Sequence, residues 1–394
     1  MEWLTQKFEL SRGGDASNLR AMEGLRGFAV SLVFLVHYVT LVQPWLQGNG
    51  AILRLSSALH TVGNTGVDLF FVLSGYLIYG SLISRAQPFA RFMSRRITRI
   101  YPTFLVVFAL YVALSFAFPV ENKIPGFGLR GALYLFANLL LLPGLLPIEP
   151  LITVAWSLSY EMFYYLAIPV LITVLKLRDR NPRVRVLFFL ALAMAATAHS
   201  AVFGGHVRLI MFVSGIVLWE VMGLGHLPVR LNLVGLAALV VGLLSTLLPM
   251  YGTFAMALKA DILFVSFLLL CLACFRHPTD WLARAFSWTP VRWLGNMSYS
   301  YYLLHGLALK AGFLILGFVL PTSSGGAWAF VVLLPVMFAI TIIPSAMLFL
   351  VIERPFSLRP TPQTRPRQPT PIIDSPKNMA TEQRGKSGTT PARR

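Results

Sequence analysis

Long apolar runs of 18 or more residues, separated by polar or basic loops, recur along the chain from about residue 25 to residue 352. Each run is long enough to cross the roughly 30 Å of hydrocarbon in a bilayer as a helix. The pattern therefore predicts an all-α polytopic membrane protein. Eleven such segments can be drawn, at residues 25–42, 62–83, 100–118, 129–146, 156–175, 186–203, 207–224, 231–249, 254–275, 298–320 and 327–352.

Two basic loops decide which segments cross. The first holds Arg85, Arg91, Arg95, Arg96 and Arg99, and the second holds Lys176, Arg178, Arg180, Arg183 and Arg185. The positive-inside rule places both loops in the cytoplasm, which requires an even number of crossings between them. Three apolar segments lie between them, so we expect 129–146, with Pro143 and Gly144 near its end, to be re-entrant or non-spanning. About ten transmembrane helices remain, with both termini cytoplasmic.

Composition supports a membrane protein and sets its expected boundaries. Hydrophobic residues make up 56% of the chain, charged residues 12%, and the mean hydropathy is +0.70, which excludes an ordinary soluble domain. We expect a cytoplasmic N-terminal segment at 1–18, one integral-membrane domain at 19–356 and a disordered, basic, proline-rich cytoplasmic tail at 357–394. The first apolar segment lacks a cleavage site after it and is interpreted as a retained signal anchor.

Charge and cysteine usage exclude two further classes. The net charge of +18 is concentrated in alternate loops, where it reports topology, so we expect no nucleic-acid partner. Cys271 and Cys274 lie in one apolar segment with no second ligand pair, so we expect neither a disulfide framework nor a metal site.

Two ionisable residues share one face of the first apolar segment. Arg26 and His37 are eleven residues apart, which corresponds to about 20° of helical rotation and about 16 Å of rise. Ionisable side chains in hydrocarbon are expensive and generally face a polar cavity that serves function. We therefore expect a cavity with Arg26 at its cytoplasmic mouth and His37 near the midplane.

Other segments bring polar side chains to a similar depth. Asp68 and Glu161 each lie early in a segment that enters from outside, roughly 8 to 9 Å from its start. Tyr299, Tyr302 and His305 form a stripe at spacing three that rises from the inner surface, with His305 about 10 Å deep. The sequence thus predicts one cavity that is polar at its centre and reached from both sides.

Each of these residues also has a purely structural explanation. An intramembrane histidine can bond a neighbouring carbonyl, and Arg26 can extend its guanidinium to the interface. Asp68 can cap its helix or pair with an arginine, and the arginines at 95–99 can serve topology alone. The joint occurrence of all these groups favours a functional cavity.

Six ordered motifs carry a family resemblance: "LRAMEGLRGFAVSLVFLVHY", "NTGVDLFFVLSGYLIYG", "RRITRIYP", "AWSLSYEMFYY", "LGNMSYSYYLLH" and "VIERP". Over residues 19–356 the chain resembles the membrane-bound acyltransferase family 3, whose members O-acylate cell-surface glycans and other acceptors. Glu23 stands where the family usually has Asp. Tyr160 and Met162 replace Val and Glu of the common "WSLSVEEQFY", which leaves the acceptor preference open.

The resemblance implies an acyl-CoA co-substrate, with acetyl as the expected group, and no permanently bound cofactor. The acceptor would be a hydroxyl of a carbohydrate-type molecule at or across the bacterial inner membrane. Arg26, Arg95, Arg96 and Arg99 would bind the CoA phosphates, because guanidinium forks suit phosphate oxygens. Tyr302 and His305 would line the donor channel, and the rise from Arg26 to His37 would match the pantetheine arm.

His37 is the candidate catalytic base, which takes the proton of the acceptor hydroxyl as that oxygen attacks the thioester. Asp68 or Glu161 would orient its imidazole, and the other carboxylate would hold the acceptor. A transient acyl-histidine remains an open variant. A proton-coupled transporter or flippase would also need buried charges, but the chain shows no internal repeat; a membrane scaffold would have little use for them.

Overall fold

The computed structural model describes residues 2–10, 16–46, 48, 50–126, 128–225 and 231–358. These belong to one compact unit that ends at Leu358. The predicted tail lies outside the described residues from position 359 onward. The division into segments 1–18, 19–356 and 357–394 stays a prediction.

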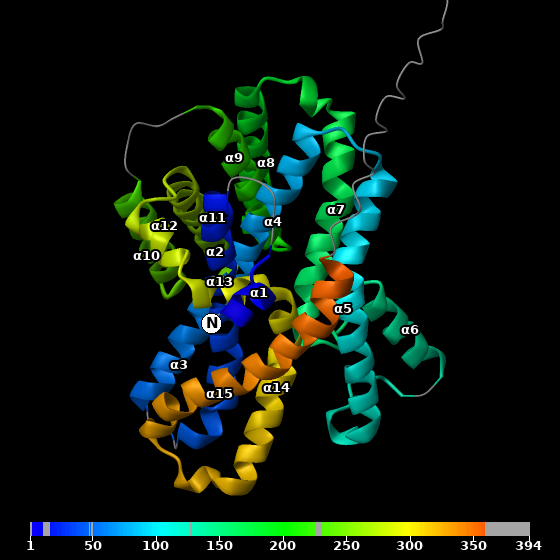
Figure 1. Cartoon of the computed structure of the whole chain (residues 1–394), viewed down its shortest axis with the longest axis vertical. Helices are drawn as coiled ribbons and strands as arrows, with labels where there is room; N and C mark the ends of the chain where they lie inside the picture. Colours follow the sequence, from blue (N-terminus) through cyan, green and yellow to red (C-terminus); the bar gives the residue numbers. More distant parts are fainter. Residues whose placement is uncertain are drawn as a thin grey trace, which may run out of the picture. The chain divides into compact units, whose positions relative to one another are not determined.

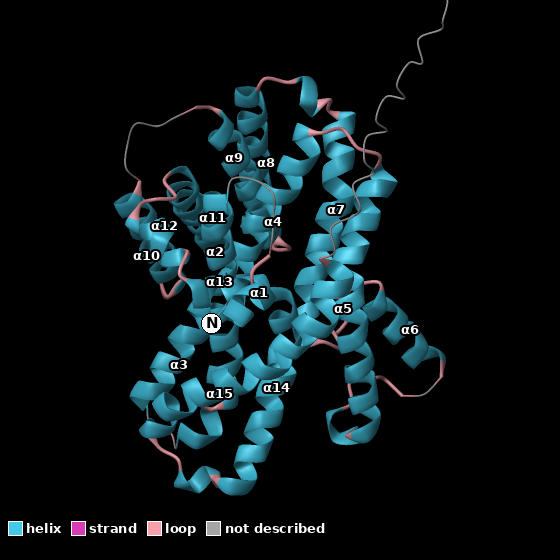
Figure 2. Ribbon diagram, viewed as in Figure 1, coloured by secondary structure: helices cyan, strands magenta, loops and turns pink. Residues whose placement is uncertain are grey.

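The described residues are almost entirely helical, as Figures 1 and 2 show. The helices are α1 (Glu2–Phe8), α2 (Ala16–Leu41), α3 (Gly50–Gly63), α4 (Thr65–Ser84), α5 (Phe89–Ala117), α6 (Leu129–Leu139), α7 (Trp156–Val174), α8 (Pro182–Phe203), α9 (Ile210–Gly223), α10 (Asn232–Thr246), α11 (Gly252–Arg276), α12 (Trp281–Phe286), α13 (Thr289–Asn296), α14 (Ser298–Val319) and α15 (Ala327–Leu348). A π-helical segment, Phe349–Ser357, continues α15.

Eight helical stretches within the described ranges are long and apolar enough to cross a membrane. The prediction of an all-α polytopic membrane protein is therefore confirmed. Two of the ten predicted crossings, α9 and α10, are shorter, at 14 and 15 residues. The segment predicted not to span contains only the 11-residue α6, which ends ahead of Pro143 and Gly144. Helix α3 has no counterpart among the eleven predicted segments.

Helix α2 is central, because it packs against α3, α4, α11, α12, α13, α14 and α15. Its first turns approach α12 and α13 at backbone distance: a Cβ added at Gly27 would lie 2.0 Å from the Val291 carbonyl oxygen, and one at Gly24 would overlap the Phe286 carbonyl. Only glycine permits such contact between two helices. This packing fixes the backbone that carries Arg26.

Helices α4 and α9 are in similarly close contact. A Cβ at Gly75 would lie 2.2 Å from the Phe212 carbonyl oxygen, and one at Gly215 would lie 2.0 Å from that of Val72. Small residues let membrane helices approach each other this closely. Dispersion contacts between the helices then hold them together, because there is no hydrophobic driving force for helix association in lipid. Helix α4 is thereby fixed as one wall of the site described below.

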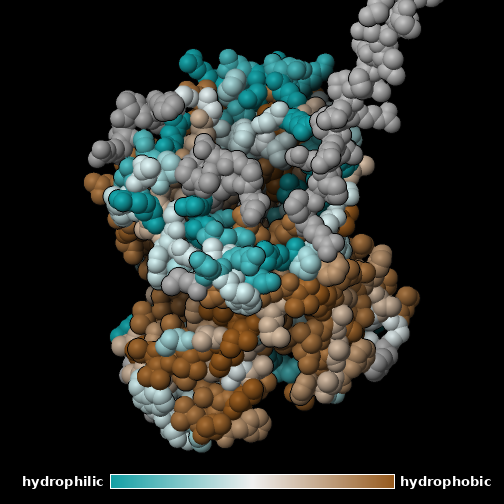
Figure 3. Space-filling view, in the orientation of Figure 1, coloured by the Kyte–Doolittle hydropathy of each residue, from teal (hydrophilic) through white to brown (hydrophobic). Residues whose placement is uncertain are grey.

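The outer surface of α14 and α15 is apolar. Phe318 is 92% exposed, Ile315 65% and Val331 68%. Apolar residues (brown) gather over these helices and the adjoining part of α5 in the lower half of Figure 3, whereas hydrophilic residues (teal) lie in the upper half. A continuous apolar face of this kind is suited to contact with lipid.

Candidate active site

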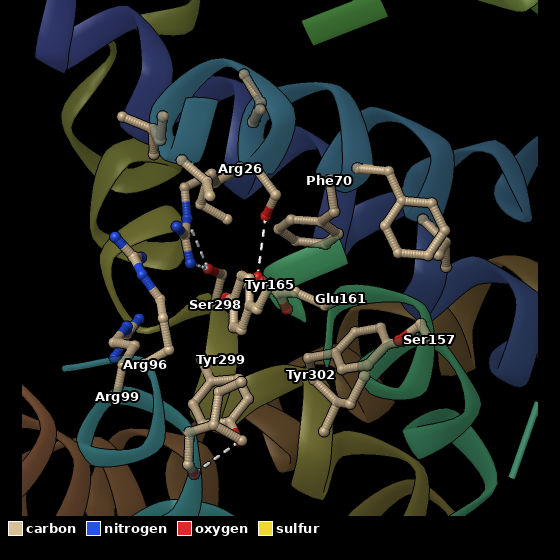
Figure 4. Close-up of a pocket in the computed structure, with 18 residues that line it drawn as sticks. Arg26, Phe70, Arg96, Arg99, Ser157, Glu161, Tyr165, Ser298, Tyr299 and Tyr302 are labelled. Carbon is tan, nitrogen blue, oxygen red and sulfur yellow. Dashed lines mark hydrogen bonds between the residues drawn. The ribbon is translucent and has the colours of Figure 1, made fainter. Parts of the chain in front are cut away.

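A pocket lined by three arginines lies where α2, α4, α5, α7 and α14 meet (Figure 4). We call it the arginine pocket. Its polar lining residues are Arg26, Ser74, Arg96, Arg99, Ser157, Glu161, Tyr165, Ser298, Tyr299 and Tyr302. Three guanidinium groups and one carboxylate face this space, so the pocket is suited to an anionic ligand.

The three guanidinium groups have different environments. Arg26 donates from Nε and Nη2 to the Ser298 hydroxyl, at 3.2 and 2.9 Å. The Arg99 Nη1 lies 2.6 Å from Glu353 Oε1, and Glu353 is fully buried. Glu353 also accepts from the backbone and hydroxyl of Ser300, at 2.9 and 2.6 Å. The charge of Arg99 is thus balanced within the protein, and the π-helical segment is tied to the start of α14.

Arg96 has no such counter-charge. It forms none of the ion pairs found among the described residues. Its guanidinium lies 5.3 Å from the Phe92 ring centroid and 5.6 Å from that of Tyr165, and its Nε has no hydrogen-bond partner in the described part of the chain. Aromatic contacts hold a guanidinium in place while its donors remain able to bind an anion.

Glu161 is held by hydroxyl donors on one oxygen. Its Oε1 accepts from Ser74 at 3.0 Å and from the Tyr165 hydroxyl one helical turn further on. Because Tyr165 also contacts Arg96, the carboxylate and the unbalanced guanidinium share one aromatic neighbour. Glu161 is thereby positioned within the arginine pocket.

A second pocket contains His37, and we call it the His37 pocket. Apolar side chains of α5, α14 and α15 make up most of its lining, with Thr40 near His37. Glu121, Lys123 and Lys310 supply its charges. Lys310 pairs with Glu121, and Lys123 lies 3.0 Å from Glu149. The pocket therefore combines an apolar body with one titratable imidazole.

The two pockets are stacked along the direction of three helices. Helices α2, α5 and α14 each line the arginine pocket first and the His37 pocket later in the chain. The paired contributions are Arg26 and then His37 from α2, 96–100 and then 110–115 from α5, and 298–302 and then 303–315 from α14. Since each pair follows the same order along parallel helices, the pockets occupy successive depths.

Three residues form a dividing wall between the pockets. The Tyr302 hydroxyl donates to the Val154 carbonyl at 3.0 Å and lies 2.8 Å from the Ser157 hydroxyl. Tyr302 and Ser157 line the arginine pocket, and Val154 lines the His37 pocket. All three are buried. Tyr302 thus joins the lining of one pocket to the lining of the other by direct hydrogen bonds.

The structure brings five of the predicted site residues together. Arg26, Arg96, Arg99, Glu161 and Tyr302 all line the arginine pocket. His37, however, lies in the other pocket, so the single cavity expected from the sequence is two. Arg26 and His37 both contact α14, at Ser298 and His305 respectively, but they line separate pockets.

The remaining predicted residues line neither pocket. Asp68 is buried, and its Oδ1 lies 3.6 Å from Arg208 Nε, which is the pairing that the sequence left open as a structural alternative. Arg95 is exposed on α5. His305 is fully buried beside His37, with 5.0 Å between their ring centroids. Asp68 and His305 therefore face the space of neither pocket.

Sequence reasoning missed the hydroxyl groups of the site. Ser298, Ser157 and Ser74 hold Arg26, Tyr302 and Glu161 respectively. Serine is common in membrane helices, and its neighbours across a helix interface cannot be read from spacing along one helix. The sequence feature that could have indicated these three serines is their location, because each lies inside one of the six motifs.

No metal centre is evident in the described ranges, since no three His, Cys, Asp or Glu side chains come together there to hold an ion.

Comparison with known protein families identifies the class of enzyme. A family model described as an acyltransferase domain matches residues 19–347. The chain belongs to the acyltransferase 3 family.

Similar acyltransferase 3 proteins are bacterial. The chain is 27% identical over 320 residues to the peptidoglycan O-acetyltransferase OatA of Listeria monocytogenes, covering 72% of this chain and 48% of OatA. It is 29% identical over 324 residues to the O-acetyltransferase OatA of Staphylococcus aureus, covering 73% and 50%. It is 27% identical over 377 residues to the acyltransferase MdmB of Streptomyces mycarofaciens, covering 86% and 91%.

The chain thus spans about half the length of the two OatA proteins and nearly all of MdmB. No solved structure gives a significant match. The acyltransferase 3 domain in this chain is a multi-pass membrane domain, and its acyl donor and acceptor are taken up next.

Proposed function

We propose that the protein transfers an acyl group, with acetyl as the expected group, from cytoplasmic acyl-CoA to a hydroxyl of a carbohydrate-type acceptor across the bacterial inner membrane. The observation that supports this most is the stacking of two pockets on opposite sides of one wall. A donor and an acceptor from opposite faces of a bilayer would need this arrangement.

The donor is assigned to the arginine pocket. The loop at 84–99 is predicted to be cytoplasmic, so the end of the pocket with Arg96 and Arg99 would face the cytoplasm. Along α4 the pocket extends from Val67 to Ile78, which corresponds to about 16 Å of helical rise. An extended pantetheine arm has a length of this order. The CoA phosphates would bind at the arginines, with the thioester near the dividing wall.

The acceptor is assigned to the His37 pocket. Segments predicted to lie at the outer surface, around Lys123 and Leu151, form part of its lining. Two relatives named as OatA are O-acetyltransferases, one of them of peptidoglycan by name, so a glycan hydroxyl is the acceptor class that we propose. The apolar lining would hold the less polar faces of such a molecule.

The chemistry assigned to the site is direct transfer. The thioester carbonyl reaches past Tyr302 into the His37 pocket, where His37 removes the proton from the acceptor hydroxyl while that oxygen attacks the thioester carbon. The oxyanion that forms is stabilised by a donor from the arginine pocket, with Tyr302 or Arg26 as the candidates. The carbon–sulfur bond then breaks, and the CoA thiolate takes the proton from His37. Every atom is accounted for, and no redox step is needed.

Transfer of labelled acetyl from acetyl-CoA to membrane material tests this proposal. Inside-out vesicles from cells that contain the protein expose its predicted cytoplasmic side to [14C]acetyl-CoA. The His37→Ala variant should lose transfer by about 100-fold or more, because a positioned base contributes at least this factor. His199→Ala, on α8 and outside both pockets, is the matched control. Full transfer by His37→Ala, or none by the wild type, would contradict the proposal.

A further inference from the structure

We propose that His305 is the positioning residue for His37, and that it holds the His37 imidazole in the form that can accept a proton. This inference rests on the proposed function. The two rings are in contact, with centroids 5.0 Å apart and planes at 63°. His305 has no exposed surface and lines neither pocket, so a substrate cannot reach it directly.

Backbone contacts fix where His305 carries its proton. Its Nδ1 lies 2.9 Å from the carbonyl oxygens of both Tyr301 and Tyr302. Carbonyl oxygens only accept hydrogen bonds, so Nδ1 must be the protonated nitrogen. In a neutral imidazole the other nitrogen then has a free lone pair and acts as an acceptor. His305 Nε2 is therefore an acceptor.

This acceptor has no partner among the described residues. His305 Nε2 is buried, and no protein donor bonds to it in that part of the chain. An unmet buried acceptor is unfavourable, and the neighbouring His37 ring carries an N–H that can satisfy it. The stacked Tyr301 ring, at 5.3 Å and 6°, blocks rotation of His305 away from this position.

A hydrogen bond from His37 to His305 Nε2 would give His37 one defined tautomer. The proton of His37 would lie on the nitrogen that faces His305, and the bare nitrogen would face the His37 pocket, as a general base requires. His305 would thus fill the orienting role that the sequence assigned to Asp68 or Glu161. Neither carboxylate lines the His37 pocket, because Asp68 pairs with Arg208 and Glu161 lies in the arginine pocket.

Two substitutions at position 305 separate positioning from packing. His305→Phe keeps an aromatic ring but loses the acceptor, whereas His305→Gln loses the ring but can place an acceptor oxygen near the position of Nε2. We expect His305→Phe to lower kcat for transfer from [14C]acetyl-CoA by about tenfold or more with little change in KM for acetyl-CoA, and His305→Gln to retain most of kcat. His305→Asn, whose shorter amide reaches only the position of Nδ1, should lose kcat as His305→Phe does. The reverse order, with Phe active and Gln inactive, would show packing only.

A second measurement does not depend on transfer activity. Diethyl pyrocarbonate modifies the bare nitrogen of a neutral imidazole, and mass spectrometry of the peptide that contains His37 follows its rate. We expect His305→Phe to slow modification of His37 several-fold and His305→Gln to restore it. Equal rates in wild type and both variants would overturn the role of His305. A wild type that fails to transfer acetyl while these rates differ would instead overturn only the proposed function.

Discussion

At the scale of single residues, the neighbours of each arginine decide whether its positive charge is already balanced within the protein. Arg99 is balanced by Glu353, and Arg26 is held by the Ser298 hydroxyl, whereas Arg96 is held by aromatic rings. Arg95, one position earlier on the same helix, is exposed and lies outside both pockets. Adjacent arginines of one motif thus have different environments, and Arg96 lines the arginine pocket against aromatic rings, with no ion pair among the described residues.

Removing the charge of Arg96 should therefore weaken donor binding. We expect Arg96→Gln to raise the KM for acetyl-CoA by about tenfold or more, since a hydrogen bond to a charged group contributes about 1.5–3 kcal/mol. Arg95→Gln should leave KM within about twofold, because charges exposed to solvent contribute little. Steady-state kinetics over a range of acetyl-CoA concentrations measures both. An equal rise in the two variants would place the phosphates outside the pocket.

The sequence indicated the three arginines, Glu161 and Tyr302 of the arginine pocket but not their pairing. Helical spacing along one segment places Arg26 and His37 on one face, as the structure has them on α2. Contacts between segments depend on helix packing, which spacing does not encode: Asp68 meets Arg208 and Glu353 meets Arg99 across long stretches of chain. The catalytic and donor-binding roles of these residues stay predictions.

At the scale of elements, the wall between the pockets depends on how α14 meets the chain before α7. The hydrogen bonds of Tyr302 to Val154 and Ser157 hold α14 against the 3₁₀ turn Thr153–Ala155 and the first turn of α7. Tyr301, the preceding residue of α14, bonds instead to Thr341 of α15 at 2.8 Å. One helix therefore closes the wall with one tyrosine and anchors α15 with its neighbour.

Opening the wall should uncouple the reaction. We expect Tyr302→Ala to join the two pockets, admit water to the thioester and raise the release of CoA without acetylation of membrane material by about threefold or more, because closed sites protect reactive groups from hydrolysis. A thiol assay for free CoA, run beside the [14C] transfer assay, gives the ratio of the two. Tyr251→Ala, at a side chain that is 89% exposed and outside both pockets, removes a side chain of the same size and should leave the ratio near that of wild type. A ratio unchanged by Tyr302→Ala would show that Tyr302 does not separate the pockets.

Hydropathy predicted the long helices well and the short ones poorly. The apolar segments correspond to helices because a backbone in lipid must satisfy its own hydrogen bonds. Helix α3, with Arg54 and His60 among its residues, lacks the unbroken apolar run that the prediction relied on. The same holds for α12 and α13, which pack against α2, and for α1, whose Phe8 contacts Trp293 of α13.

At the scale of the whole molecule, the proposed direction of transfer depends on topology, which single cysteines can test. Both native cysteines, Cys271 and Cys274, are buried and should not react with a reagent in solution. Ser94, in the first turns of α5, and Ser324, between α14 and α15, are exposed and lie in parts of the chain predicted to be inside and outside, respectively.

A membrane-impermeant maleimide applied to intact spheroplasts should therefore label Ser324→Cys strongly and Ser94→Cys weakly. Lysis of the spheroplasts should make the two variants equally reactive, and the unmodified protein serves as the background. Labelling of Ser94→Cys before lysis would reverse the orientation and, with it, the assignment of donor and acceptor to the two pockets.

The partition at Tyr302 has a bioenergetic consequence under the proposed function. Only the small acyl group has to pass from the arginine pocket to the His37 pocket during transfer. The nucleotide stays on the cytoplasmic side, and the sugar stays on the outer side. The bilayer can then stay sealed to protons and other ions between turnovers. A bacterium could accumulate many copies of this enzyme without discharging the electrical potential that drives its ATP synthesis.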